Sequence, residues 1–259
     1  MQIIITIIVC LVAGCGAGLG TGFAGMSAAV VITPMLTTFL EIPAYSAIGI
    51  ALASDILASA VSAYTYHKNR NLDIRNGIVM MGAVLLFTLV GSFVANFVPN
   101  DTMGGTSVFM TTLMGIKFIV QPVTATKESM EAVSPGKCLV QSILCGMAVG
   151  FICGFVGAGG GMMMLMILTM VLGYELKTAV GTSVFIMTFT AFTGAISHFA
   201  IDTNTPDVLV LGLCMLFTFI FARIGAHIAN KVSAKVLNRA TGVILVLLGM
   251  AVIGIGAFV

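Results

Sequence analysis

Charge is scarce in this sequence. Only 8% of the 259 residues are charged, whereas 59% are hydrophobic and the mean hydropathy is +1.16. A soluble domain carries about 25% charged residues, so this composition cannot supply a water-facing surface. The scarcity excludes a soluble enzyme, a nucleic-acid-binding protein and a disordered scaffold. We therefore expect an integral membrane protein.

Two long stretches, 1–40 and 138–174, contain no Asp, Glu, Lys, Arg or His. As single helices they would measure roughly 55–60 Å, about twice the hydrocarbon core of a bilayer. Each stretch must therefore hold two membrane segments, separated where glycine gathers. The second segment of each, near Met26–Leu40 and Met162–Leu172, is too short to cross comfortably. We expect broken or re-entrant, glycine-flanked helices near 20–40 and 157–172.

The rest of the chain contains six further apolar runs, which brings the expected number of membrane segments to ten. Strands of a membrane β-barrel would be about ten residues long with alternating polarity, whereas these runs are longer and apolar all round. The fold class is therefore all-α. The six runs are 44–66, 77–98, 102–120, 178–199, 208–229 and 236–258.

The sequence repeats itself internally. A shift of 132 residues superposes Gly22-Phe23 and Gly25 on Gly154-Phe155 and Gly157, and after a two-residue gap a shift of 134 superposes Asp73 on Asp207. The conserved order of many such matches indicates a duplication. It predicts an N-terminal repeat (1–120), a linker (121–137) and a C-terminal repeat (138–259), each with about five segments.

Equivalent loops of the two repeats carry opposite charge. Loop 67–75 holds three basic residues, whereas its counterpart 199–207 holds two Asp residues; loop 99–101 holds one Asp, whereas 231–239 holds three basic residues. Lys and Arg mark the cytoplasmic side of a membrane protein. The two repeats are therefore expected to have inverted topology, with both termini extracytoplasmic, in a bacterial cytoplasmic (inner) membrane.

Inverted repeats with interrupted helices are typical of secondary transporters. A break at mid-membrane frees backbone N–H groups, and helix N-termini attract anions. Close helix packing by small residues is the alternative explanation of the glycines. The predicted backbone site is formed by Gly22, Gly25, Ser27, Gly157, Gly159, Gly160 and Gly161.

Asp55 is the one carboxylate well inside a predicted span. On a helix Asp55, Ser59, Ser62 and Tyr66 share one continuous face. Burial disfavours the charged form of a carboxyl group, which suits a group that takes up and releases a transported proton. The alternative is a protonated Asp that hydrogen-bonds to a neighbouring helix for packing.

Four more polar residues are candidates. Thr182 and Ser183 follow the second short segment, where their hydroxyls can donate to substrate oxygens or bond back to their own helix. Arg223 can reach the cytoplasmic interface with its long side chain or bind an oxyanion at the inner mouth. His198, near the outer end of its span, is an interfacial histidine or a member of a proton relay.

With these residues in view, the chain resembles the TauE/SafE sulfite-exporter (TSUP) family of membrane permeases. The resemblance rests on Gly154–Gly161, on Ala179–Ser183, on His198 with the Ile201-Asp202 loop, and on a partial copy in the first repeat. It implies transport of sulfite, sulfoacetate or related organosulfonates, often outward. Met26-Ser27-Ala28 departs from the glycine cluster that the family pattern leads us to expect.

Other functions are weighed beside this one. A channel, or a carrier for another small anion such as a carboxylate, shares every feature of composition. An intramembrane hydrolase would need a Ser–His pair, but Ser183 and His198 lie about 22 Å apart on one helix. We expect no enzyme activity, no cofactor and no metal. The expected partners are a small anion, the lipid bilayer and protons, with no nucleic acid; a homodimer is left open.

Overall fold

The computed structural model describes residues 2–95, 113, 116–128, 135–156, 160–201 and 207–256. Within these ranges the regular elements are α-helices, in agreement with the predicted fold class. Most of the expected span 102–120 lies outside the described residues. The helices are α1 (Gln2–Ala24), α2 (Ala29–Phe39), α3 (Ala44–Lys68), α4 (Ile74–Ala95), α7 (Pro135–Val156), α8 (Gly160–Met170), α9 (Leu176–Ile201), α10 (Val208–Lys231) and α11 (Ala234–Gly256).

Six of the described helices are long and apolar enough to cross a membrane: α1, α3, α4, α9, α10 and α11. The predicted short segments are also present, because α2 and α8 each contain only 11 residues. Large apolar side chains such as Ile4 on α1, Leu89 on α4 and Leu247 on α11 are more than 60% exposed. An apolar exterior of this kind fits a lipid environment, so the chain is a multi-pass membrane protein.

The first break in the chain lies at Gly25, between α1 and α2. Gly25 adopts a left-handed conformation (φ +61°), and its N–H donates to the carbonyl of Thr21 over 2.9 Å. Glycine adopts this conformation without the steric cost that a side chain imposes. The glycine cluster therefore ends α1, and the chain restarts as α2 at Ala29.

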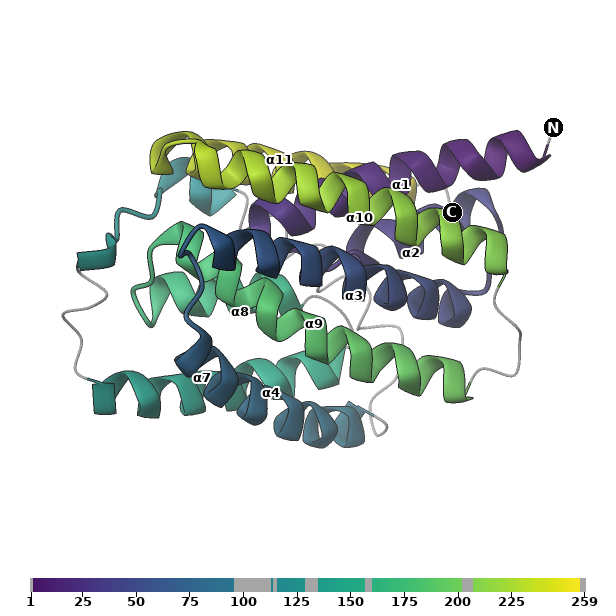
Figure 1. Cartoon of the computed structure of the whole chain (residues 1–259). Helices are drawn as coiled ribbons and strands as arrows, with labels where there is room; N and C mark the ends of the chain where they lie inside the picture. The colour runs from purple at the N-terminus through teal and green to yellow at the C-terminus, as the bar shows by residue number, and fades with distance from the viewer. Residues whose placement is uncertain are drawn as a thin grey trace.

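The helices pack in crossed pairs (Figure 1). α1 packs most extensively on α10, α4 on α7, and α3 on both α9 and α10. α2 packs on α3 and α1, and α8 on α9 and α7. The two short helices therefore lie inside the bundle, on either side of the α3–α9 pair.

The basic segments gather at one end of the bundle. Lys127 of the linker donates to the carbonyl of Arg70 over 2.8 Å, and Lys177 at the start of α9 donates to the carbonyl of Asn230 over 3.0 Å. In Figure 1 the α3–α4 and α10–α11 connections lie at this end, on the left, and the start of α1 and the end of α11 lie at the other. The α3–α4 connection, Lys127 of the linker, the start of α9 and the end of α10 are thus at the same end of the bundle.

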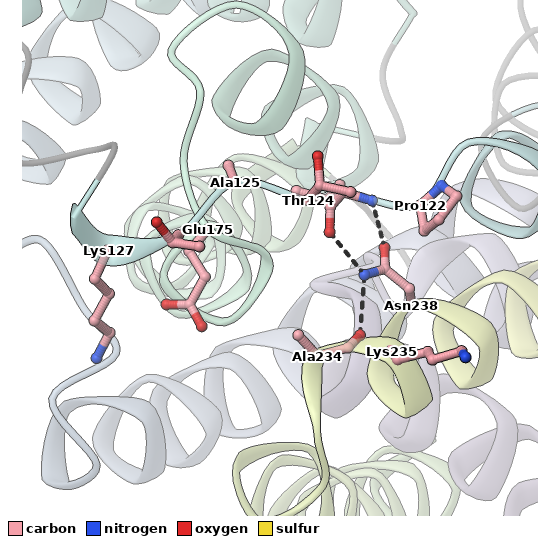
Figure 2. Close-up of a pocket in the computed structure, with 10 residues that line it drawn as sticks. Pro122, Thr124, Ala125, Lys127, Glu175, Ala234, Lys235 and Asn238 are labelled. Carbon is pink, nitrogen blue, oxygen red and sulfur yellow. Dashed lines mark hydrogen bonds between the residues drawn. The ribbon is translucent and has the colours of Figure 1, made fainter.

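A cavity of about 510 Å³ opens at this basic end, between residues 122–127, Glu175 and the start of α11. Figure 2 shows how Asn238 fixes the linker there: it accepts from the N–H of Val123 over 2.8 Å and donates to the carbonyl of Val123 over 3.0 Å. Asn238 is only 1% exposed. A buried amide with both hydrogen-bonding functions satisfied anchors the linker firmly on α11.

Candidate functional site where the first break meets α8

The first break and the start of α8 touch directly in the middle of the bundle. A Cβ added to Gly161 would overlap the carbonyl oxygen of Gly25 and lie 2.8 Å from the sulfur of Met187. A Cβ added to Gly25 would overlap the hydroxyl of Ser183 on α9. A side chain at position 161 would therefore block the backbone contact, and one at position 25 would displace the Ser183 hydroxyl. Three residues predicted from separate parts of the sequence, Gly25, Gly161 and Ser183, are thus brought together.

Asp55 lies beside this meeting point and is fully buried on α3. Its Oδ2 accepts a hydrogen bond from the Ser27 hydroxyl over 2.6 Å, while its Oδ1 has no hydrogen-bond partner. The Ser27 Oγ in turn accepts from the N–H of Ala29, at the start of α2, over 3.3 Å. The carboxyl group is therefore connected through Ser27 to the break itself.

The polar face of α3 continues from Asp55 toward the basic end. Ser59, Ser62 and Tyr66 are all 0% exposed, as the helical spacing predicts for one shared face. The Ser59 hydroxyl donates to the carbonyl of Asp55, and Thr188 of α9 donates to Ser59 over 3.1 Å. The Ser62 hydroxyl has no partner. A row of hydroxyls thus lines the α3–α9 contact.

Two other side chains hold the end of α1. The Tyr66 hydroxyl donates to the carbonyl of Gly22 over 2.9 Å, and Thr241 of α11 donates to the carbonyl of Phe23 over 3.2 Å. The last carbonyls of a helix lack partners within the helix. Side chains from two distant helices therefore satisfy the broken end and fix its position.

The remaining predicted residues are spread more widely. Thr182 is buried, and its hydroxyl accepts from the N–H of Asp73 over 3.2 Å, nearer the basic end. Gly160 is the first residue of α8, whereas Arg223 is exposed on α10. Gly157 and Gly159, and the side chain of His198, lie outside what the structure describes.

Sequence reasoning missed a second polar cluster. Asp73 precedes α4 and accepts from the Tyr174 hydroxyl over 2.8 Å and from the amide of Asn76 over 2.7 Å. An Asp directly before a helix is a signal for a cap, but nothing in the sequence pairs it with Tyr174, which lies after α8. Thr188 was missed because no periodic pattern distinguishes it from a threonine that bonds only within its own helix.

The geometry provides donors and one carboxyl group for a small ligand. The first N–H groups of α8 lack carbonyl partners within that helix, and Gly161 in this first turn lies against Gly25. The Ser183 hydroxyl also lies against Gly25, and it donates to the carbonyl of Val180 on its own helix over 2.9 Å. Donors in an apolar interior suit an anion with several oxygens. Among the described residues no three His, Cys, Asp or Glu side chains form a metal-binding cluster.

Comparison with known proteins agrees with a transport function. The family model for the sulfite exporter TauE/SafE matches residues 10–252. The chain is 23% identical to the probable membrane transporter protein YdhB of Bacillus subtilis, covering 86% of this chain and 90% of that protein. It is 26% identical to the probable membrane transporter protein MJ0441 of Methanocaldococcus jannaschii, covering 90% and 87%.

A third relative, the probable membrane transporter protein YunE of Bacillus subtilis, is 24% identical over the full length of both chains. All three relatives are named as transporters, none as an enzyme. The match of the family model extends over nearly the whole chain and includes Gly25 and the glycines at 157–161. The chain belongs to the TauE/SafE sulfite exporter family.

Proposed function

We propose that this protein is a secondary transporter that moves small sulfur-containing anions, such as sulfite, sulfoacetate or related organosulfonates. The observation that carries the proposal is the backbone contact between Gly25 and Gly161. It brings the break after α1 and the start of α8 to one point inside the bundle. Breaks of this kind persist in a membrane only where they face protein or a polar cavity, and in transporters they hold the substrate.

The proposal includes two repeats of inverted topology, 1–120 and 138–259, joined by the linker 121–137. Two pairs of helix starts support it: α3 at Ala44 and α9 at Leu176 differ by 132 positions, and α4 and α10 begin 134 apart. Packing supports it as well, because α1 on α10 and α7 on α4 are the same pairing with the repeats exchanged. Such an arrangement places α3 and α9 around a pseudo-two-fold axis.

The orientation follows from charge. We assign the basic end to the cytoplasm, which leaves both termini on the outer side of a bacterial inner membrane. Lys127 and Lys177 support the assignment, since both are held at that end by hydrogen bonds to the chain. The cavity beside Lys127 and Lys235 then opens to the cytoplasm, where it can admit or release an anion.

The substrate oxygens would be bound between the two breaks. We assign this role to the N–H groups of Gly160 and Gly161 at the start of α8, to Gly157 and Gly159 from the sequence pattern, to Gly22, Gly25 and Ser27, and to the hydroxyls of Thr182 and Ser183. Ser183 supports the assignment because its hydroxyl lies against Gly25. Asp55, together with His198, would exchange the coupling proton. Arg223, on the exposed face of α10, would act at the inner mouth of the path.

The direct test is flux of labelled sulfite and sulfoacetate in proteoliposomes, with and without a pH gradient. We expect saturable flux, driven by the gradient. Flux that rises linearly with concentration would indicate a channel. A labelled dicarboxylate that outcompetes both sulfur anions would replace the substrate class. Absence of flux of all three anions under every gradient would overturn the transport proposal.

The topology has its own test. Reporters that fluoresce only in the cytoplasm and reporters active only outside it are fused after residue 259 and inserted in the linker near Thr126. The proposal requires an external signal at the C-terminus and a cytoplasmic signal at the linker. A cytoplasmic C-terminus would refute the inverted arrangement.

A further inference from the structure

Ser27 lies between the Asp55 carboxyl group and the break at Gly25. Its hydroxyl donates to Asp55 over 2.6 Å, and its oxygen accepts from the N–H of Ala29 over 3.3 Å. It lies two residues from Gly25, whose carbonyl touches Gly161 and whose α-carbon faces the hydroxyl of Ser183. A group bound against Gly25 would therefore lie two residues along the chain from the hydroxyl that serves Asp55.

A serine hydroxyl has only one proton to donate. In the described geometry that proton is directed to Asp55 Oδ2 over 2.6 Å, and such a bond is strongest when the acceptor is ionised. When Asp55 is protonated, the carboxyl O–H can donate to Ser27 Oγ instead, and the Ser27 proton is free to turn. The carboxyl proton then lies on Oδ2, the oxygen that faces Ser27 over 2.6 Å.

We propose that Ser27 is the coupling residue of the transporter: it donates to Asp55 when the carboxyl group is ionised and to the bound anion when that group is protonated. The inference rests on the proposed function and adds its coupling device. Proton and anion then favour each other's binding, because the effect of one ligand on another is reciprocal. They bind together and cross together, which is the sign of symport rather than exchange.

Other titratable groups on the helices around α3 do not serve this role. α2 carries none, and α1 carries only Cys10 and Cys15. On α9, Lys177 is bonded to the carbonyl of Asn230, and the side chain of His198 lies beyond the described part of the chain. The others lie on α10: Cys214 is a free thiol that hydrogen-bonds with Cys10, and Arg223, His227 and Lys231 are exposed.

The test measures binding of methanesulfonate, whose charge is constant, to purified full-length protein by calorimetry at about pH 5.5 and about pH 8. Wild type is expected to bind more tightly at the lower pH. Ser27→Ala should reduce the ratio of the two Kd values about tenfold, since it removes a hydrogen bond to a charged group only in the protonated state. Ser27→Thr, which keeps the hydroxyl, should restore the ratio.

Two further variants complete the design. Asp55→Asn should bind with the low-pH affinity at both pH values, because a neutral side chain leaves the Ser27 proton free. Ser54→Ala is the matched control: Ser54 is equally buried, one residue from Asp55, and bonds only to the carbonyl of Ile50 over 2.9 Å. Where Ser27→Ala does not fold, as judged by gel filtration, Ser27→Cys replaces it, because a thiol is a weak donor.

The outcomes separate the two proposals. Full pH dependence in Ser27→Ala, or tighter binding by wild type at the higher pH, would overturn the inference while leaving an anion transporter in place. Wild-type binding that does not change with pH would also overturn the inference and leave the anion transporter in place. Failure of wild type to bind methanesulfonate, sulfite and sulfoacetate would overturn the proposed substrate class and this inference with it.

Discussion

The stretches that contain α2 and α8 share a backbone plan but differ in chemistry. After α2, Glu41 has φ +55° and Ile42 N–H donates to the carbonyl of Leu36 over 3.3 Å. After α8, Gly173 has φ +68° and Tyr174 N–H donates to the carbonyl of Leu168 over 2.8 Å. Each pair of positions is 132 apart in the sequence. The same turn is therefore built twice.

The side chains near the two breaks have diverged. Where α3 places Asp55, α9 places Met187, and the sulfur of Met187 lies against Gly161. Where the first break has Ser27, the second stretch has Gly159 in the sequence. The first N–H groups of α2 are already bonded to Ser27 and Ala28. One stretch thus supplies a titratable group and the other supplies close backbone approach.

The largest effect is expected from Gly161→Leu. A side chain at this position meets the carbonyl of Gly25, which cannot rotate away as a side chain can. We expect loss of all flux and a cost of about 1–3 kcal/mol or more from overpacking. Proteoliposome flux and thermal melting in detergent measure the two effects. The control is Gly82→Leu on α4, which meets open space; equal damage from both variants would refute the contact between the breaks.

The second-largest effect is expected from exchanging Asp55 and Met187, the residues at equivalent positions of α3 and α9. Asp55→Met should remove the dependence of flux on a pH gradient and leave the Ser27 hydroxyl without its acceptor, at a cost of about 1–3 kcal/mol. Adding Met187→Asp should not restore the dependence, because Gly159 offers no hydroxyl. Flux at equal and unequal pH is the measurement. Recovery in the double variant would show that either position can hold the coupling acid.

Gly25→Ala is expected to have a moderate effect. It costs about 1–2 kcal/mol for a side chain in the left-handed region, and further energy because the new methyl group meets the Ser183 hydroxyl. Ser183→Ala in the same chain should recover the second part but not the first. Melting temperatures of the two single variants and the double variant form a cycle. Strict additivity in that cycle would count against the Gly25–Ser183 contact.

The smallest effects test whether the repeated turns are energetically equivalent. Glu41 is exposed, so Glu41→Gly relieves left-handed strain without removing a buried contact and should stabilise the fold by about 1 kcal/mol. Gly173→Ala meets open space and should destabilise it by a similar amount. Thermal melting compares the two. If both substitutions shifted the melting temperature in the same direction, the two turns would differ in their energetics and not only in the residue at the left-handed position.

Much of the plan could be predicted from the sequence because it depends on local properties. Charge-free runs predicted the two pairs of segments, and glycine predicted the break that Gly25 makes. Helical spacing predicted the buried face from Asp55 to Tyr66. Each of these follows from composition or from a period along one helix.

The pairing of residues could not be predicted in the same way. Ser27 and Asp55 were both candidates, but their hydrogen bond depends on how α2 packs on α3. The contact between Gly161 and Gly25 joins positions 136 residues apart and depends on the packing of the whole bundle. The hydrogen bond between Tyr174 and Asp73 likewise joins residues that are far apart in the sequence. A single sequence carries periods along the chain, whereas these contacts are set by crossing angles between helices.

The contact between Gly25 and Gly161 also has a mechanical consequence. Packed side chains can absorb a small displacement by changing rotamer, but a carbonyl oxygen against an α-carbon has no such freedom. The two segments must therefore either move together as one rigid unit or separate completely. A carrier built around that joint would switch between discrete positions, without a continuous series of partly open forms.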